Sequence, residues 1–223
     1  MLGLSNGLAY STHQDAFNVA DINGLAHWYK YQTNFTLSGS NVTTWGDSFG
    51  SNDLSKSGAS NILYNSGDVD FDTNGGKMSF GSTWNPGSFA FYIVFKITAG
   101  SIVNEEIANS DSSNFFRLNS GTEARIRIGN TTNNDITLSS GLAAGSFHAI
   151  GIEWDGTTIN IYSGKNTILG TAEDTDEFAG LSTIGLRGNQ FDGHIREIVL
   201  VNNTLSAGDR AGLFEHLEAV RDK

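Results

Sequence analysis

The chain has 223 residues, a formal net charge of −11 at pH 7 and no cysteine. This length suits one all-β domain with a sizeable core, and the absence of cysteine excludes disulfides, thiolate metal sites and a cysteine nucleophile. Lys and Arg together number only 13, so a phosphate-binding surface for nucleic acid is not expected.

The first twenty residues contain apolar side chains without a clear period. We expect an N-terminal docking arm over 1–20 and a globular domain over 21–223. The candidate docking residues of the arm are Leu2, Leu4, Leu8, Tyr10 and Phe17. The alternative is a disordered or tag-derived terminus. The stretch 1–22 has no Lys or Arg, and no segment approaches the roughly 20 apolar residues of a membrane span, so neither a secretory signal nor a membrane partner is expected.

Short alternating or apolar runs, separated by turn residues, occupy most of the remaining chain. They predict strands over 25–31, 41–45, 68–72, 77–80, 88–97, 101–108, 114–119, 124–128, 135–139, 147–154, 158–163 and 194–202. Each such strand needs cover on at least one face, so the pattern predicts an all-β, two-sheet antiparallel sandwich. The run 88–97 is apolar on both faces for much of its length, which predicts a central strand.

Two local signals are sharper. Asp155-Gly156 lies between two alternating runs, and this dipeptide suits the positive backbone angles of a tight hairpin turn. Near the C-terminus the period changes to that of a helix with Ser206 as its N-cap. Its apolar face consists of Leu213, Phe214, Leu217 and Val220. We therefore predict one short C-terminal helix.

The stretches "WDGTTINIY" (154–162) and "FDGHIREIVLVNNTLS" (191–206), the latter followed by the predicted helix, are the most specific motifs. With them, the chain from about residue 24 to 221 resembles the concanavalin A-like lectin/glucanase superfamily in its laminin-G-like branch. The resemblance implies a jelly-roll sandwich. Such modules are frequent in bacteriophage virion proteins and in secreted multidomain bacterial proteins, and the short opening before the module resembles that of a stand-alone phage structural protein.

Glucanases of that superfamily carry a cluster of carboxylates on one strand, because hydrolysis needs a general acid and a second carboxylate. The nearest approach here is Glu153-Trp154-Asp155, but Asp155 is needed in the hairpin turn. Glu105 and Glu106 are adjacent and would face opposite sides of a strand. We therefore expect no enzyme activity.

The stretch "DVDFDTNGGKMSF" (68–80) copies the opening half of an EF-hand calcium loop. Gly81 stands where that loop needs a bidentate Glu, and a strand spreads alternate carboxylates too far apart for an easy cage. What remains is one calcium ion at the rim, held by Asp72, Asn74 and turn carbonyls. No other cofactor is expected, since the five histidines show no zinc-site spacing.

A shallow sugar site needs an aromatic face with nearby Asn and Asp side chains. Trp84, in "GSTWNPG", and Phe191-Asp192, in "NQFDG", lie in or near predicted loops and are the candidates for such a site. The alternative for Trp84 is a plug at one end of the sandwich. The other tryptophans fall in predicted strands and are expected in the core: Trp28, Trp45 and Trp154.

Two functions follow from these patterns. The first is a non-enzymatic virion structural protein on the virion surface, a capsid decoration protein or a head or tail fibre subunit. Its arm would dock on other virion proteins. The sequence leaves open whether the protein forms a homo-oligomer. The alternative is a carbohydrate-binding module that recognises a cell-surface glycan.

Overall fold

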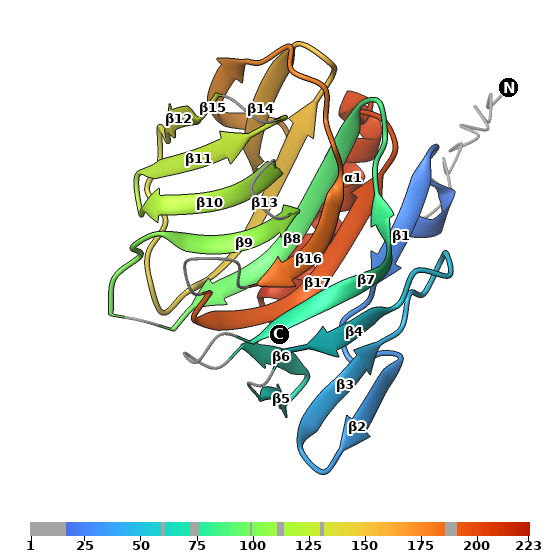
Figure 1. Ribbon diagram of the computed structural model, residues 1–223. Coiled ribbons are helices and arrows are strands. Elements are labelled where there is room, and N and C mark those ends of the chain that lie inside the picture. Colours follow the sequence, from blue (N-terminus) through green and yellow to red (C-terminus); the bar gives the residue numbers. More distant parts are fainter. Residues whose placement is uncertain are drawn as a thin grey trace, which may run out of the picture.

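The computed structural model describes residues 17–58, 61–71, 76–98, 100–110, 114–129, 132–185 and 191–223. Within these ranges the chain forms 17 strands, a short 3-10 helix and one α-helix (Figure 1). No helix in these ranges combines the length and the apolar content needed to cross a bilayer.

The strands form two layers. One layer contains β1 (Leu25–Tyr29), β5 (Ile62–Asn65), β6 (Asp68–Phe71), β8 (Phe89–Ile97), β13 (Phe147–Trp154), β14 (Thr158–Ser163), β15 (Thr167–Glu173) and β17 (Gly193–Val201). The other contains β2 (Phe35–Ser38), β3 (Asn41–Trp45), β4 (Leu54–Ser57), β7 (Lys77–Trp84), β9 (Glu105–Ser110), β10 (Asn114–Ser120), β11 (Glu123–Arg127), β12 (Asn134–Thr137) and β16 (Leu181–Gly185).

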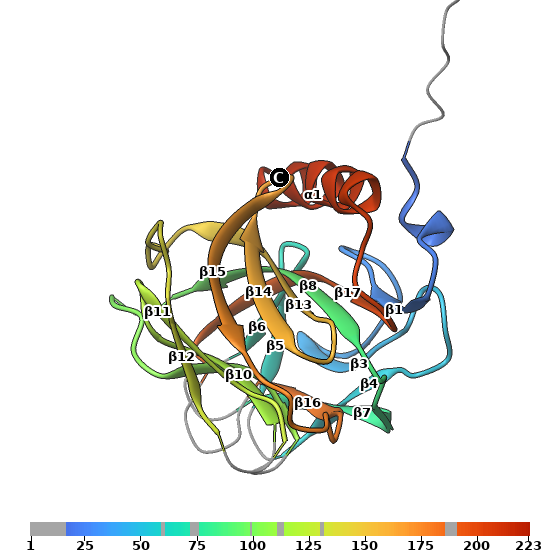
Figure 2. The same ribbon diagram turned by 90° about the horizontal axis from the view of Figure 1, so that it is seen from above.

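The strand pairings within the described ranges are antiparallel, and the two layers curve toward each other at their edges (Figure 2). At one edge the amide of Ser139, just after β12, bonds to the carbonyl of Leu169 on β15. At the other edge β3 pairs with β5 through Asn41 and Leu63. The predicted all-β, two-sheet jelly roll with one C-terminal helix is confirmed.

Strand β8 occupies the middle of the first layer, between β13 and β17. One of its faces points into the core between the layers, through Phe89, Phe91, Ile93, Phe95 and Ile97. The other face packs under helix α1 (Ala207–Arg221), through Ala90, Tyr92 and Val94. Because both faces are covered, the strand is apolar throughout most of its length, as predicted for 88–97.

Helix α1 lies across the outer surface of the first layer (Figure 2). Its buried face consists of Leu213, Phe214, Leu217 and Val220, the four residues expected there. Ser206 is the N-cap, and its hydroxyl accepts the backbone N–H of Asp209 at 3.1 Å. The predicted helix and its cap are confirmed.

An ion pair fixes the start of this helix to the sheet. The guanidinium of Arg210 donates from Nε and Nη2 to the two carboxylate oxygens of Glu153, both at 2.9 Å. The hydroxyl of Tyr92 donates to the same carboxylate at 2.5 Å, and Arg210 also stacks on the ring of Tyr162. Glu153 is buried and fully engaged in holding the helix, so its role is structural.

The hairpin between β13 and β14 has the expected turn. Gly156 has a positive φ of 101°, and the carboxylate of Asp155 accepts the backbone N–H groups of Thr157 and Thr158 at 2.9 and 2.8 Å. These hydrogen bonds, the one from Thr158 foremost, lower the pKa of Asp155. The prediction that the turn occupies Asp155 is confirmed.

The N-terminal arm is described only from Phe17 onward. Val19–Asp21 forms the 3-10 helix η1, and Val19 is buried in the cluster beneath α1. The ring of Phe17 lies directly against Gly212 of α1, because a Cβ at Gly212 would come within 2.2 Å of it. Phe17, predicted to dock on a partner, therefore contacts its own domain while remaining 39% exposed. The other candidate arm residues lie outside the described part of the chain: Leu2, Leu4, Leu8 and Tyr10.

The Arg210→Met variant tests the anchoring of the helix. It leaves the buried Glu153 carboxylate without its cation, so we expect the free energy of unfolding to fall by about 3–5 kcal/mol in urea denaturation. The double variant Glu153→Gln/Arg210→Met removes the buried charge and should be more stable than the single variant. Equal losses in the two variants would contradict this explanation.

Candidate functional site

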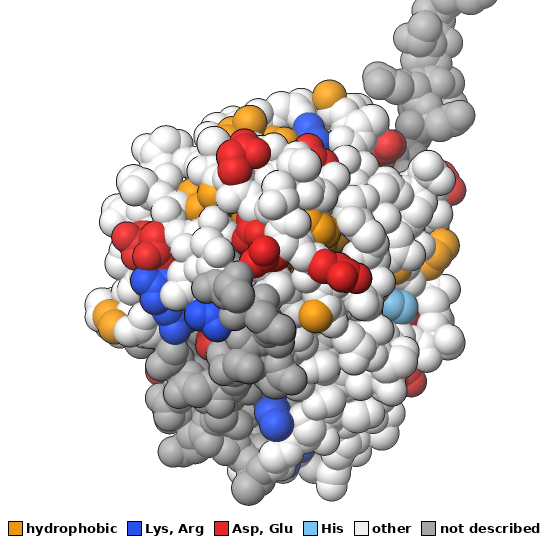
Figure 3. Space-filling view, turned by 45° about the horizontal axis from the view of Figure 1, so that its top comes forward, with side chains coloured by type: hydrophobic (Ala, Val, Ile, Leu, Met, Phe, Trp, Pro, Cys, Tyr) orange, Lys and Arg blue, Asp and Glu red, His pale blue; other side chains and the backbone are white. Residues whose placement is uncertain are grey.

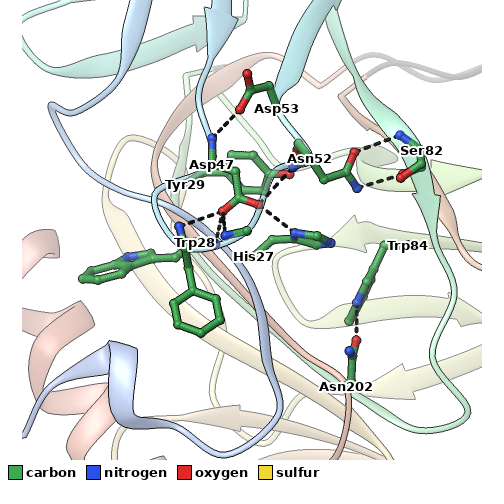
Figure 4. A network of polar contacts seen from close by, with 11 residues as sticks. His27, Trp28, Tyr29, Asp47, Asn52, Asp53, Ser82, Trp84 and Asn202 are labelled. Carbon is green, nitrogen blue, oxygen red and sulfur yellow. Dashed lines mark hydrogen bonds and ion pairs between the residues drawn. The ribbon is translucent and has the colours of Figure 1, made fainter.

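The loop over residues 46–53, between β3 and β4, is organised around the carboxylate of Asp47 (Figure 4). This side chain has no exposed surface and accepts five hydrogen bonds. Oδ1 accepts the backbone N–H groups of Trp28 (3.0 Å), Phe49 (3.1 Å) and Gly50 (3.0 Å), and Oδ2 accepts Nδ1 of His27 (2.8 Å) and the N–H of Asn52 (3.3 Å). The loop and strand β1 are thus held by one buried anion.

The protonation of Asp47 reflects this environment. Burial alone raises the pKa of a carboxyl group, but the hydrogen bonds from His27 and from the backbone of Trp28, Phe49 and Gly50 outweigh it. The pKa of Asp47 therefore lies well below its ordinary value. The carboxylate stays charged at neutral pH and keeps its donors in place.

The second half of the loop is fixed to β7 and β1. The side-chain amide of Asn52 donates to the carbonyl of Ser82 and accepts the N–H of Ser82, each at 2.8 Å. These two bonds take the place of a backbone strand pairing beside β7. The hydroxyl of Tyr29 donates to the carbonyl of Asn52, and burial raises the pKa of this tyrosine. Asp53 accepts the backbone N–H of Asp47 at 2.9 Å. The loop is therefore constrained from both ends.

What this constrained loop presents to solvent is an aromatic ring. Phe49 is 48% exposed, although its backbone N–H is held by Asp47. Gly50, the next residue, has no space for a side chain, because a Cβ would come within 2.6 Å of Asp47 Oδ2 and 2.7 Å of the Ala26 carbonyl. The close approach at Gly50 keeps the loop tight against β1 and leaves the neighbouring ring outside.

Polar groups surround the base of the loop. His27 donates from Nδ1 to Asp47, so in its neutral form Nε2 is an acceptor, and within the described residues it has no hydrogen-bond partner. The amide of Asn34 donates to the hydroxyl of Ser48 at 3.1 Å. The loop thus carries an exposed aromatic ring and has hydroxyl, amide and imidazole groups at its base, which are the kinds of group that a shallow sugar site uses.

The Asp47–His27 pair also resembles the arrangement that orients a catalytic histidine. In the described part of the chain no hydroxyl is hydrogen-bonded to Nε2 of His27. The observed geometry thus supplies an imidazole nitrogen that can bind a hydroxyl.

Trp84, predicted to be part of a sugar site, is not accessible. It is 4% exposed, and its indole packs against Phe89 and Phe178 with ring centroids 5.7 and 6.1 Å away. Its Nε1 donates to Asn202 at 2.8 Å. The prediction of a sugar-facing Trp84 is wrong, and the alternative of a plug at one end of the sandwich describes its position. The remaining tryptophans are buried as expected: Trp28, Trp45 and Trp154.

Phe191 and Asp192 do not complete a site with Trp84. Phe191 is 1% exposed and packs edge-on against Phe71. It lies near the Ile97 end of β8, whereas Trp84 lies near the Phe89 end, a strand length of about 27 Å. Asp192 is half-buried, and its N–H donates to Glu105 at 3.0 Å. The prediction that Phe191 faces a sugar is also wrong.

The candidate calcium ligands Asp72 and Asn74 lie outside the described residues. Elsewhere in the described ranges, no group of three or more His, Asp or Glu side chains is placed to hold a metal ion. On β6, Asp68 pairs with Arg196 at 2.8 Å, and Asp70 lies 3.8 Å from His194. The carboxylate of Asp68 is therefore compensated by Arg196 of β17, whereas Asp70 lies near a histidine whose pKa is lowered by burial.

No protein-family model matches the chain, and no curated protein matches it in sequence. Solved structures share its fold. The botulinum neurotoxin DC binding domain in complex with SialylT is 15% identical with a TM-score of 0.63, and the match covers 90% of this chain and 52% of that one. A complex of the same binding domain with rat synaptotagmin II is 14% identical with a TM-score of 0.63, and this match also covers 90% of this chain and 52% of that one.

A Trypanosoma rangeli sialidase in complex with sialic acid is also similar, at 13% identity and a TM-score of 0.60 over 90% of this chain and 34% of that one. The chain thus spans about half of the toxin chains and a third of the sialidase. At these identities the likeness shows the fold alone, a jelly roll, and gives no support for a phage origin.

The pH dependence of stability tests the role of Asp47. Because its folded pKa is lowered, its contribution is present above the ordinary pKa of about 4 and is lost as the pH falls below that value. We expect Asp47→Asn to be about 2 kcal/mol less stable at pH 7 and the gap to wild type to narrow between about pH 5 and pH 2 in urea denaturation. A constant gap over this range would contradict a role for the charge.

Proposed function

We propose that the protein is a carbohydrate-binding module that recognises a glycan through the loop over 46–53. The observation that carries this proposal is the exposed ring of Phe49 on a loop whose backbone is fixed by the buried Asp47 carboxylate. A preformed aromatic surface loses little conformational entropy on binding, which favours affinity for a weakly interacting ligand such as a sugar.

In this proposal each group has a distinct role. The ring of Phe49 stacks on the apolar C–H face of a pyranose, and Nε2 of His27 accepts a hydrogen bond from a sugar hydroxyl. Ser48, which precedes Phe49 in the loop, and Asn34, which donates to the Ser48 hydroxyl, supply further hydroxyl and amide groups. Asp47 does not contact the ligand; it positions both Phe49 and His27, which bind to different oxygens of its carboxylate.

The structural neighbours support a glycan ligand. One toxin binding domain with this fold was solved with SialylT, and the sialidase with sialic acid. The virion role expected from the sequence has no such support. Most of its proposed docking residues lie outside the described chain, and Phe17 packs on its own helix. We therefore favour glycan recognition without hydrolysis, and an assay with β-glucan should detect no products.

Replacement of Phe49 tests this function. After the full-length chain has been screened on a glycan array, Phe49→Ala should lower the affinity for a bound glycan about tenfold, the equivalent of about 1.4 kcal/mol of stacking. Its stability should change little, because the ring is largely exposed.

Leu37→Ala and Ile168→Ala are matched controls, since both remove an exposed apolar side chain elsewhere, 44% and 49% exposed. These variants should bind like the wild type. An array without any bound glycan, or an equal loss of affinity in all three variants, would refute the proposal.

A further inference from the structure

The outward face of β10 and β11 holds three arginines, two of which lie over the same aromatic ring. Arg117 lies on β10, and Arg125 and Arg127 lie on β11. The strand register places Arg117 opposite Arg125 and Phe115 opposite Arg127. The alternate residues of the same strands, Phe116 and Ile126 among them, point into the core. Basic side chains gather in this way at one place on the surface, next to acidic ones (Figure 3).

This arrangement breaks the usual rule for facing residues in a sheet. Like charges directly opposite on neighbouring strands destabilise the pairing, and the chain has only 13 Lys and Arg to place. One of the two facing cations is neutralised locally. Arg125 forms a two-pronged ion pair with Asp135 on β12, with Nη2 2.7 Å from Oδ2. On its other side Arg117 faces the buried carboxylate of Glu106 on β9, and Asp135 lies nearby, but within the described chain neither forms an ion pair with Arg117 as close as that of Arg125 with Asp135.

The guanidinium of Arg117 is held in place, but only one of its nitrogens makes a hydrogen bond within the described residues. Its Nε donates to Asn119 at 3.0 Å, and its Cζ lies 5.2 Å from the ring centroid of Phe115. Within the described residues its two Nη groups have no hydrogen-bond partner. Burial, followed by the neighbouring cation of Arg125, lowers the pKa of Arg117. An anion bound at this position would favour the charged form of Arg117 and so offset both the burial and the repulsion from Arg125.

Arg127 completes the setting. Its Cζ lies 4.9 Å from the same ring of Phe115, so the two guanidinium carbons are at most about 10 Å apart. Arg127 Nε and Nη2 both donate to the side-chain oxygen of Asn133, at 2.9 and 2.6 Å. Stacking on the ring and bonds to the amides orient both planar forks.

We propose that Arg117, together with Arg127, forms a second binding site, and that its ligand is the carboxylate of an acidic sugar. The planar fork of a guanidinium matches a carboxylate with two parallel N–H···O bonds, and the amide group of Asn133 lies beside Arg127 for a neighbouring sugar hydroxyl. Asn119 orients Arg117, and its own amide nitrogen donates to Glu123. The site deepens the proposed glycan recognition by naming the sugar class, but rests on different residues.

The two sites are well separated. Strands β4, next to the Phe49 loop, and β11 are separated by β7, β16, β9 and β10, which is about 24 Å at the usual strand spacing. A substitution at one site is therefore expected to leave the other intact, and the two proposals can fail independently.

The test uses the full-length chain and a matched pair of ligands, 3′-sialyllactose and lactose, in calorimetric titrations at low and at physiological salt. We expect wild type to bind the acidic sugar at least tenfold more tightly than the neutral one, with weaker binding at higher salt. Arg117→Gln should remove this preference, and Arg117→Lys should restore only part of it, because a lysine keeps the charge and loses the fork.

Arg221→Gln is the matched control, since it removes the same charge from the exposed end of helix α1. Thermal melts of every variant establish that it is folded, and Arg127→Lys replaces Arg117→Gln if Arg117→Gln is not folded.

Loss of the acidic preference in Phe49→Ala but not in Arg117→Gln would overturn the second site. Equally tight binding of inorganic phosphate or a sulfated disaccharide would overturn the carboxylate assignment. If the wild type binds 3′-sialyllactose through Arg117 but does not bind lactose, this result would count against the Phe49 site only.

Discussion

Strand β8 imposes the central constraint on this fold, because it is apolar on both faces and lies in the middle of its layer. The inner face is covered by the second layer, but the outer face needs cover that no strand supplies. Helix α1 provides it through Phe214 and its neighbours. The helix thereby covers β8 and its neighbours β13 and β17, and both of the proposed binding sites lie on the loops and strands of the second layer.

Buried charges then fix the elements that cover or extend the core. Glu153 binds Arg210 and holds the start of the helix. Glu197 accepts Nε1 of Trp28 at 2.7 Å and Nε2 of His216 at 2.5 Å, which joins β17, β1 and the helix. The buried carboxylate of Asp47 fixes a loop in the same way, but the residue that this loop presents, Phe49, has an exposed ring. Arg117 is the exception, a partly buried cation whose compensation is incomplete.

Much of the architecture follows from the sequence, because strands such as 147–154 and 158–163 alternate clearly and Asp155-Gly156 marks their turn. The unpredicted strands are short, polar or largely exposed: β2, β4, β5, β15 and β16. They exist because neighbours pair with them, and a single sequence does not show this. The site was misplaced for a related reason. Trp84 was expected in or near a loop but is the last residue of strand β7, where its side chain faces inward, and Phe191 turns inward just before β17.

Phe49 had a local signal, since Asp47, Ser48 and Gly50 around it are turn residues, but the donors that reach Asp47 from β1 are visible only in the fold. Sugar binding by this preformed loop can be observed residue by residue. The measurement is of backbone amide NMR shifts while the protein is titrated with a glycan that the array identifies. The largest changes should fall on Phe49, Gly50 and His27. Changes confined to other surfaces, with these three amides unmoved, would contradict the claim.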